Sequence, residues 1–163
     1  MLKIPYFDNA EVELVEELDP DAPEEAATLA AFLSLTAADR LADTRHVYAY
    51  YRDFYEAVGG EGWIDEEMGV PEAPADIWNY VTPGGIELRK GRNGDDNWYV
   101  LMEANCGWEA EHGLMMVWRN GTTLSKVGGY DGHATNVNAR ANPSLANVVY
   151  AASNPKYTTR LGE

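Results

Sequence analysis

The nine residues "CGWEAEHGL", from Cys106 to Leu114, contain the only cysteine of the chain, two glutamates and one of its three histidines. Thiolate, imidazole and carboxylate groups bind zinc, and a thiol beside a histidine can act as the nucleophile and base of an enzyme. A second group of such residues follows in "YDGHATN", where Asp131 and His133 lie two positions apart. These two stretches are therefore the first candidates for a chemical site.

The spacing of these residues gives weak support for a metal site. The residues of a type that zinc accepts are Cys106, His112, Asp131 and His133. Neither C-x-x-C nor H-E-x-x-H occurs in the sequence. Calcium or magnesium could use Glu109, Glu111 and Asp131, but these lack the dense oxygen pattern of an EF-hand loop. The sequence therefore predicts no bound metal and no cofactor, and a metal-dependent enzyme or sensor that uses both stretches is kept as an alternative.

Covalent and acid–base catalysis are also weakly supported. Cys106 could pair with a histidine, but no basic neighbour or helix start is expected to lower its pKa. Glu109 and Glu111 could act as the carboxylate pair of a glycosidase, but nothing in the sequence sets their separation. The segments "TPGG" and "KVGGY" lack the phosphate-binding and dinucleotide-binding patterns. The sequence therefore assigns no catalytic residue.

The second half of the chain is expected to position these residues with strands. Four strand-like runs, "GIELRKG", "NWYVLMEAN", "GLMMVWR" and "TTLSKVGG", are separated by "NGDD", by the stretch from Cys106 to His112, and by Asn120-Gly121. Asn-Gly between two strands is a strong hairpin signal, because both residues adopt positive φ readily. We expect strands near 113–119 and 122–128 to pair. Alternate connections of an antiparallel meander lie at the same end, so the 105–112 loop and "YDGHATN" are expected side by side.

The first half is expected to supply two helices and one edge strand. "PEEAATLAAFLSL" begins with Pro23 and two glutamates, which favour a helix start. Thr36 is a suitable N-cap for a second helix, which Gly59 and Gly60 should end. Alternation around Val12 and Leu14 predicts an edge strand. The predicted fold is α+β, with an antiparallel meander of about four to six strands packed against the two N-terminal helices.

Length and composition predict a single domain spanning residues 1–163. Hydrophobic residues make up 45% of the chain, which is enough for a folded core. The first residues do not resemble a secretory signal, and no apolar run is long enough to span a bilayer. One cysteine cannot form an internal disulfide. A cytoplasmic protein that does not contact membranes is therefore expected.

The net charge of −15 is concentrated in two segments. Residues 1–25 contain nine acidic residues and one lysine, and residues 56–76 contain seven acidic residues and no basic residue. Such a surface repels phosphate backbones and attracts basic proteins, so direct binding of nucleic acid is disfavoured. The predicted binding residues are Glu11, Glu13, Glu16, Glu17, Asp65, Glu66 and Glu67.

The charge therefore predicts a non-enzymatic acidic protein-interaction module. Its partner is expected to be a basic protein, such as a toxin or a nucleic-acid-binding protein, and to associate at a rate that salt reduces. One alternative is a nucleic-acid mimic, in which carboxylates spaced like phosphates occupy a DNA-binding surface. The other is that the acidity serves only solubility.

Residues 106–136, "CGWEAEHGLMMVWRNGTTLSKVGGYDGHATN", resemble a bacterial domain family of unknown function with a W-E-x-E-H-G-L block followed by a D-G-H-x-T-N block. The resemblance implies an immunity-like or phage-related interaction protein. It singles out Trp108, Glu109, Glu111, His112, Gly113, Asp131, Gly132, His133 and Asn136. These residues either form a ligand pocket or hold the meander together. In the second case Asp131 and Asn136 cap a turn, and His112 is buried and hydrogen-bonded.

Overall fold

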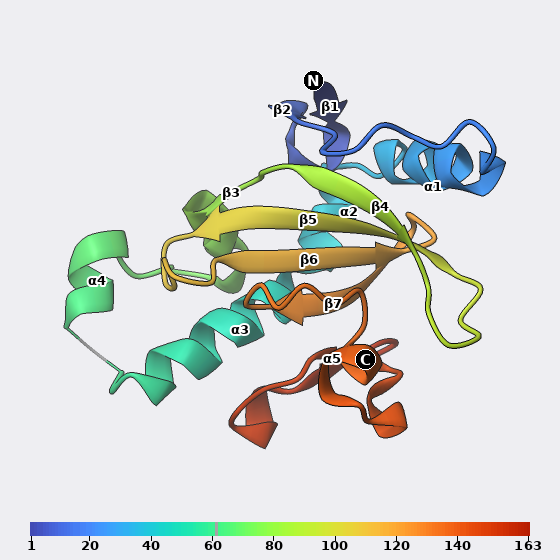
Figure 1. Cartoon of the computed structure of the whole chain (residues 1–163). Helices are drawn as coiled ribbons and strands as arrows, with labels where there is room; N and C mark the ends of the chain where they lie inside the picture. Colours follow the sequence, from blue (N-terminus) through green and yellow to red (C-terminus); the bar gives the residue numbers. More distant parts are fainter. Residues whose placement is uncertain (61) are drawn as a thin grey trace.

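The computed structural model describes residues 1–60 and 62–163 as a large sheet with helices and a small hairpin around it (Figure 1). Glu61, part of the acidic segment 56–76, lies outside the described residues. The helices are α1 (Pro23–Leu33), α2 (Ala37–Ala42), α3 (Thr44–Ala57), α4 (Trp63–Met68) and α5 (Asn136–Arg140). The strands are β1 (Leu2–Ile4), β2 (Ala10–Val12), β3 (Val81–Thr82), β4 (Ile86–Lys90), β5 (Trp98–Cys106), β6 (Leu114–Arg119), β7 (Thr123–Gly128), β8 (Val148–Tyr150) and β9 (Thr159–Arg160).

The larger sheet has seven strands in the order β3-β5-β6-β7-β8-β9, and β4 pairs with β5 on the same edge as β3. Strands β4 to β7 pair antiparallel, and the mixed α+β class is confirmed. The sheet is larger than the predicted four to six strands and is not a pure meander. Strand β8 joins β7 in parallel, because the chain crosses back through α5 before it reaches Val148.

The predicted hairpin at Asn120-Gly121 is confirmed. Strands β6 and β7 pair antiparallel, and Asn120 and Gly121 have φ of 53° and 73°. Thr122 adds a third loop residue, so Arg119 faces Thr123. A side-chain carbon at Gly121 would overlap the carbonyl oxygen of Thr28 and lie 2.9 Å from the amide nitrogen of Phe32. This glycine therefore allows α1 to pack directly on the hairpin.

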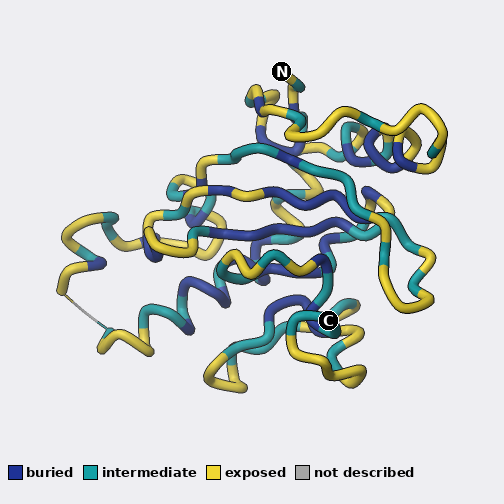
Figure 2. The backbone as a smooth tube through the Cα atoms, in the orientation of Figure 1, coloured by how far each residue is buried: buried dark blue, intermediate teal, exposed yellow. Residues whose placement is uncertain are grey.

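The main core includes Val100, Met102 and Met116 from the large sheet. Figure 2 shows that the central strand β6 is buried along most of its length. The ring of Phe32 from α1 lies 4.6 Å from that of Trp118, and Tyr51 from α3 belongs to the same cluster. The N-terminal helices therefore contribute to one face, together with the β1–β2 hairpin.

The second predicted helix is instead two helices that meet at Asp43. Thr36 caps α2 as expected, with its hydroxyl accepting from Ala38 and Asp39 accepting from the Thr36 amide. The carboxylate of Asp43 accepts a hydrogen bond of 2.9 Å from Tyr6, which ties the junction to the N-terminal segment. Gly59 and Gly60 have positive φ beyond the end of α3, as predicted.

The predicted edge strand around Val12 and Leu14 is divided. Strand β2 ends at Val12, and Leu14 forms an isolated parallel bridge with Ile86 of the large sheet. The backbone of residues 10–15 therefore passes from the small hairpin onto the edge of the large sheet. The exposed Glu11 and Glu13 remain on its outer side.

The opposite face of the large sheet carries a smaller apolar cluster of Tyr99, Leu101, Met115, Val117 and Ala134. The presence of apolar residues on both faces of β5 agrees with the sequence pattern. The segment after β7 covers this cluster. The sequence analysis predicted no helix or strand in that segment. No described helix combines the length and the apolar character needed to cross a bilayer.

Candidate functional site

The loop from Gly107 to Gly113 is organised by the carboxylate of Glu109. This carboxylate accepts hydrogen bonds from the amide of Glu111 at 2.7 Å and from the amide of His112 at 3.0 Å. It also lies 2.8 Å from Nδ1 of His112. Glu109 is almost buried, whereas the His112 side chain is 64% exposed. The prediction that His112 is hydrogen-bonded is correct and the prediction that it is buried is wrong, because the loop turns its imidazole outward.

The residues next to Glu109 in the sequence have structural roles. Trp108 is fully buried, and its ring meets those of Tyr50 and Tyr51 edge-on at 5.5 and 5.7 Å. Burial raises the pKa of the Cys106 thiol to about 11, so the thiol is protonated at neutral pH. A protonated thiol is a poor nucleophile and a poor metal ligand. The geometry therefore gives no support to a Cys106 enzyme.

The turn from Asp131 to His133 is held by a buried lysine. Lys126 Nζ donates to Asp131 Oδ1 at 2.5 Å and to the carbonyl of His133 at 2.8 Å. The same Asp131 oxygen accepts from the amide of His133 at 3.0 Å, which is the predicted turn cap. Asn136 caps no turn with its side chain; instead its amide donates to the carbonyls of Val148 and Val149 and anchors β8.

The two sequence blocks meet through the backbone. The amide of Tyr130 donates to the carbonyl of His112 at 3.1 Å, and a side-chain carbon at Gly129 would lie 3.3 Å from His112 Cβ. Beyond this contact the second block turns toward Lys126.

One group of described residues has metal-ligand atoms close together. Single ligand atoms of Glu109, Glu111 and His112 lie within 4.8 Å of one another. Cys106, Asp131 and His133, from the zinc set considered above, do not belong to this group.

The acidic residues occupy separate places. Figure 1 shows α4, with Asp65, Glu66 and Glu67, at the left end of the large sheet, and shows β2, which precedes Glu16 and Glu17, above the sheet. Asp65 is half-buried and accepts a hydrogen bond from Tyr55. The predicted residues therefore come from two separate parts of the fold, the segment around β2 and helix α4.

Helix α4 adjoins the Glu109 loop. A side-chain carbon at Gly107 would lie 3.1 Å from Met68 Sδ, and the Gly107 amide donates to the carbonyl of Tyr80. The second acidic segment and the W-E-x-E-H-G-L block therefore share one end of the sheet. No spacing in the sequence relates these two stretches.

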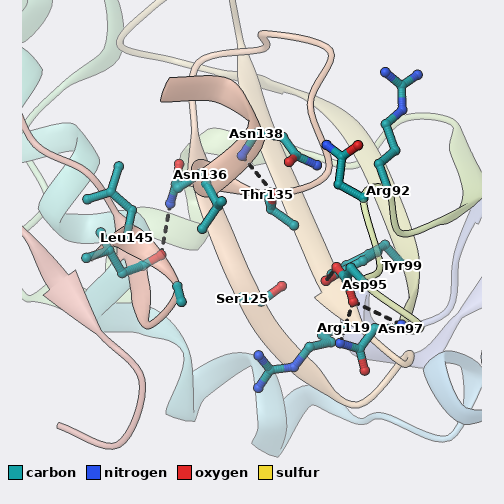
Figure 3. Close-up of a pocket in the computed structure, with 14 residues that line it drawn as sticks. Arg92, Asp95, Asn97, Tyr99, Arg119, Ser125, Thr135, Asn136, Asn138 and Leu145 are labelled. Carbon is teal, nitrogen blue, oxygen red and sulfur yellow. Dashed lines mark hydrogen bonds between the residues drawn. The ribbon is translucent and has the colours of Figure 1, made fainter. Parts of the chain in front are cut away.

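A cleft with polar and apolar lining residues lies between the sheet and the segment around α5 (Figure 3). It has a volume of about 360 Å³ and is lined by Tyr99 and Ser125 from the sheet and by Thr135 and Asn138 from the covering segment. Sequence reasoning missed this cleft. The only available signal was "LRKGR", Leu88 to Arg92, a basic run in a strongly acidic chain.

The structure is a mixed α+β protein with two exposed acidic segments and a separate cleft. Residues 1–134 match the model of a domain of unknown function, DUF6985, and the chain belongs to that family. No curated protein and no solved structure matches the chain. The match includes the W-E-x-E-H-G-L block and ends inside the second block, so the expected membership of a family of unknown function is confirmed. The bacterial and immunity-like character stays a prediction.

Proposed function

We propose that this chain is a non-catalytic binding module that docks a basic protein on the surface of α4. The observation that carries the proposal is the combination of exposed apolar and unpaired acidic side chains in one short segment. Trp63 is 46% exposed and Val70 is 60% exposed. The exposed carboxylates beside them belong to Glu66, Glu67 and Glu72.

The charges on the α4 surface, defined by Trp63, Glu66, Glu67, Val70 and Glu72, are available to a partner. Within the described residues, none of its carboxylates lies within 4.0 Å of a lysine, arginine or histidine nitrogen. An exposed tryptophan ringed by polar groups is typical of an interface anchor. The carboxylates favour a partner of opposite charge and speed its approach.

We assign no catalytic role because the residues of the two sequence blocks have structural contacts. Glu109 holds its own loop, Trp108 lies in the core, and Asp131 pairs with Lys126. Such roles explain these residue types without a substrate. The partner remains defined by its chemistry, a basic protein surface with an apolar pocket for an indole ring.

The test is position-specific photo-crosslinking in cells that naturally express the chain. A photoreactive phenylalanine analogue replaces Trp63 in one version and Leu41, which is also exposed, in the other. We expect a defined crosslink from position 63 only, to a protein with a basic surface. Binding of that purified partner should weaken with Trp63→Ala, and its association should slow as salt screens charges beyond about 8 Å.

The controls separate docking from general charge attraction. Lys3→Glu makes the chain more negative by two charges at a position away from α4, and should leave the affinity for the partner unchanged. Glu66→Gln with Glu67→Gln makes it less negative by two charges on α4, and should weaken binding. Equal crosslinking from positions 63 and 41, an acidic partner, or a Trp63→Ala variant with unchanged affinity would each reject the proposal.

A second candidate function, a metal-dependent sensor or enzyme, is favoured by the grouping of Glu109, Glu111 and His112. Nδ1 of His112 is engaged by Glu109, which leaves Nε2 for a metal, an arrangement common at zinc sites. The test is zinc titration followed by calorimetry on the unaltered chain and on the Glu111→Gln and His112→Gln variants. Stoichiometric binding that both variants weaken supports this candidate; binding that neither changes, or no binding, rejects it.

A further inference from the structure

The cleft continues the smaller apolar layer between the sheet and the segment after β7. Tyr99 is a member of the smaller apolar cluster, and it also lines the cleft. The other side of the cleft is lined by apolar residues of the covering segment, namely Val137, Leu145 and Ala146. The two walls of the layer are therefore separated here, and an apolar group bound between them would complete the layer.

The cleft is large enough for a small organic molecule. Its volume is about 360 Å³. An apolar cavity of roughly 150 Å³ holds one benzene ring, and natural ligand pockets begin at roughly 300 Å³. One wall is the sheet and the other is the covering segment, as Figure 3 shows for Ser125 and Asn138. A compact molecule built on an aromatic ring therefore fits between the two walls.

An irregularity in strand β7 lies on the sheet side of the cleft. Lys126 pairs with Val117 and Leu124 pairs with Trp118, so Ser125 is an extra residue that forms a β-bulge. Ser125 lines the cleft, and its hydroxyl donates to the carbonyl of Val117. Bulges re-aim side chains and occur often beside active sites. The regular strand pairing is therefore interrupted at the residue that faces the cleft.

The charges inside the cleft are balanced. Asp95 and Arg119 both line it. Burial raises the pKa of Asp95, but hydrogen bonds from Tyr99 and Asn97 lower it by more, and the positive charge of Arg119 lowers it further. Figure 3 shows the guanidinium groups of Arg92 and Arg119 at opposite ends of the cleft, pointing away from each other. The middle of the cleft therefore has no charge that is free to hold an ion.

The polar groups in the middle of the cleft are uncharged. The hydroxyl of Thr135 accepts a hydrogen bond of 3.1 Å from the Asn138 backbone amide and keeps its own proton to donate. The side-chain amide of Asn138 makes no hydrogen bond with any described residue, and an amide offers both donors and an acceptor. A neutral polar group on a ligand can satisfy these two side chains.

We propose that the cleft binds a small uncharged organic molecule that has an apolar ring and one neutral polar group, such as an amide. The ring would lie between Tyr99 and Leu145, and the polar group would meet Thr135 and Asn138. A charged ligand is disfavoured because it would lose its hydration without gaining a counterion of its own. This site does not depend on the function proposed for the α4 surface.

The test is a nuclear magnetic resonance titration of the full chain with benzamide, benzoate and benzamidinium. These probes share one planar shape and are uncharged, anionic and cationic. We expect benzamide to give saturable shifts of the amide signals of Ser125 and of residues 135–138, and each ion to bind at least about fivefold more weakly. No saturable shift with benzamide, or an ion that binds within that factor of benzamide, would overturn the proposal.

A matched pair of substitutions locates the site. Ala146 and Ala38 are both exposed, and only Ala146 lines the cleft. Ala146→Phe places a ring in the opening and should abolish the saturable shifts with benzamide. Ala38→Phe adds the same ring on α2 and should leave the affinity unchanged. Unchanged binding by Ala146→Phe, or an equal loss in Ala38→Phe, would show that benzamide does not bind in the cleft.

A second pair of substitutions tests the balance of charge. Arg119→Gln leaves Asp95 without the neighbouring positive charge, so the affinity for benzamidinium relative to benzamide should rise by about threefold or more. Arg92→Gln removes an equal charge at the opposite end of the cleft and should change this ratio less. An equal change in both variants would overturn the assignment of an uncharged ligand, because Arg119 would then not balance Asp95 within the cleft.

Discussion

Lys126 and Asp131 form an ion pair whose two members differ sharply in burial. Their charged atoms lie 2.5 Å apart, and the lysine side chain is 2% exposed whereas the aspartate side chain is 40% exposed. Burial lowers the pKa of Lys126, and the neighbouring Asp131 opposes that effect. The aspartate can be hydrated without its partner, but the lysine cannot. Loss of either member should therefore have unequal consequences.

We expect Asp131→Asn to destabilise the protein more than Lys126→Met. The first change leaves a buried ammonium without its counterion, which costs about 3 kcal/mol, and the second leaves a hydrated carboxylate and costs about 1 kcal/mol. Urea unfolding of both variants measures the difference. Without Asp131 the folded pKa of Lys126 falls further below its unfolded value near 10.5, so the variant should gain stability as the pH rises toward that value. Equal costs would contradict this description of the turn.

Alanine substitutions at Gly121 and at Gly94, compared with each other, test the packing of α1 on the hairpin. Both have positive φ, at 73° and 85°, but a side-chain carbon at Gly94 meets nothing within 4 Å. Gly94→Ala should cost about 1 kcal/mol, the strain of a left-handed residue. Gly121→Ala should cost about 3 kcal/mol or more, because the added carbon also collides with backbone atoms of α1. Thermal and urea unfolding would compare them, and similar losses would argue against close packing at Gly121.

The junction of α2 and α3 should respond to pH. Burial raises the pKa of Asp43 to about 6, while the hydrogen bond from Tyr6 lowers it by less. The contribution of this group to stability is complete below its unfolded pKa of 3.8 and is lost as the pH rises through about 6. Asp43→Asn keeps an acceptor for Tyr6 and has no proton to lose. The variant should therefore gain stability relative to the unaltered chain as the pH rises from 4 to about 7.

Protonation of His46 makes stability change with pH in the opposite direction, so the unaltered chain and the Asp43→Asn variant must be compared at each pH. Burial lowers its pKa to about 4, so the unfolded chain binds a proton first, and stability falls as the pH falls from 6.5 to 4. This effect is present in both proteins and cancels in the difference between their unfolding free energies. Urea unfolding at several pH values gives that difference. A difference that stays constant with pH would show that Asp43 does not titrate as described.

Charge reversals distinguish the two acidic surfaces. Glu16→Lys with Glu17→Lys, and Glu66→Lys with Glu67→Lys, change the charge equally at different places. Each double variant should alter the unfolding free energy by less than about 0.5 kcal/mol, because these side chains are exposed and unpaired. The α4 pair should slow association with the crosslinked basic partner by the larger factor. A larger effect of the N-terminal pair would move the binding surface to the segment around β2.

Glu109 should matter for stability more than its position in a loop suggests. Glu109→Ala removes the acceptor for two loop amides and for the His112 ring, and should cost about 2 kcal/mol. The exposed neighbour Glu111 makes no such bonds with its side chain, so Glu111→Ala should cost less than about 0.5 kcal/mol. Unfolding by urea tests both. Equal small effects would mean that the loop is held without the Glu109 carboxylate.

The elements that the sequence predicted well are those with local signals. Strands β4 to β7 alternate or run apolar between Gly- and Asn-containing turns, and Asn120-Gly121 specifies the hairpin directly. The Thr36 cap was equally local. The break at Asp43 was missed; Asp43 accepts a hydrogen bond from Tyr6, 37 positions away, which no local pattern predicts.

The candidate site was harder to predict, for the same reason. The side chain of His112 was placed wrongly because its neighbour Glu109 is the buried member of the pair. The cleft has one wall from the sheet and another from residues 135–148, and no sequence spacing relates Arg119 to Asn138. Which side chain is buried, and which distant residues meet, depends on how the elements pack together. A local sequence pattern does not contain that information.

The covering segment after β7 gives the cleft a thermodynamic property. Its attachments include the parallel pair between Val127 and Tyr150 and hydrogen bonds from the Tyr150 hydroxyl and the Ser153 and Asn154 amides to the buried Asp53, together with side-chain contacts of Thr159 with His46 and of Tyr157 with Glu56. When this segment detaches, the cleft loses one wall and with it any affinity for a ligand. Occupancy of the cleft and attachment of the C-terminal residues are therefore linked equilibria, so any molecule bound there would also slow hydrogen exchange along β8.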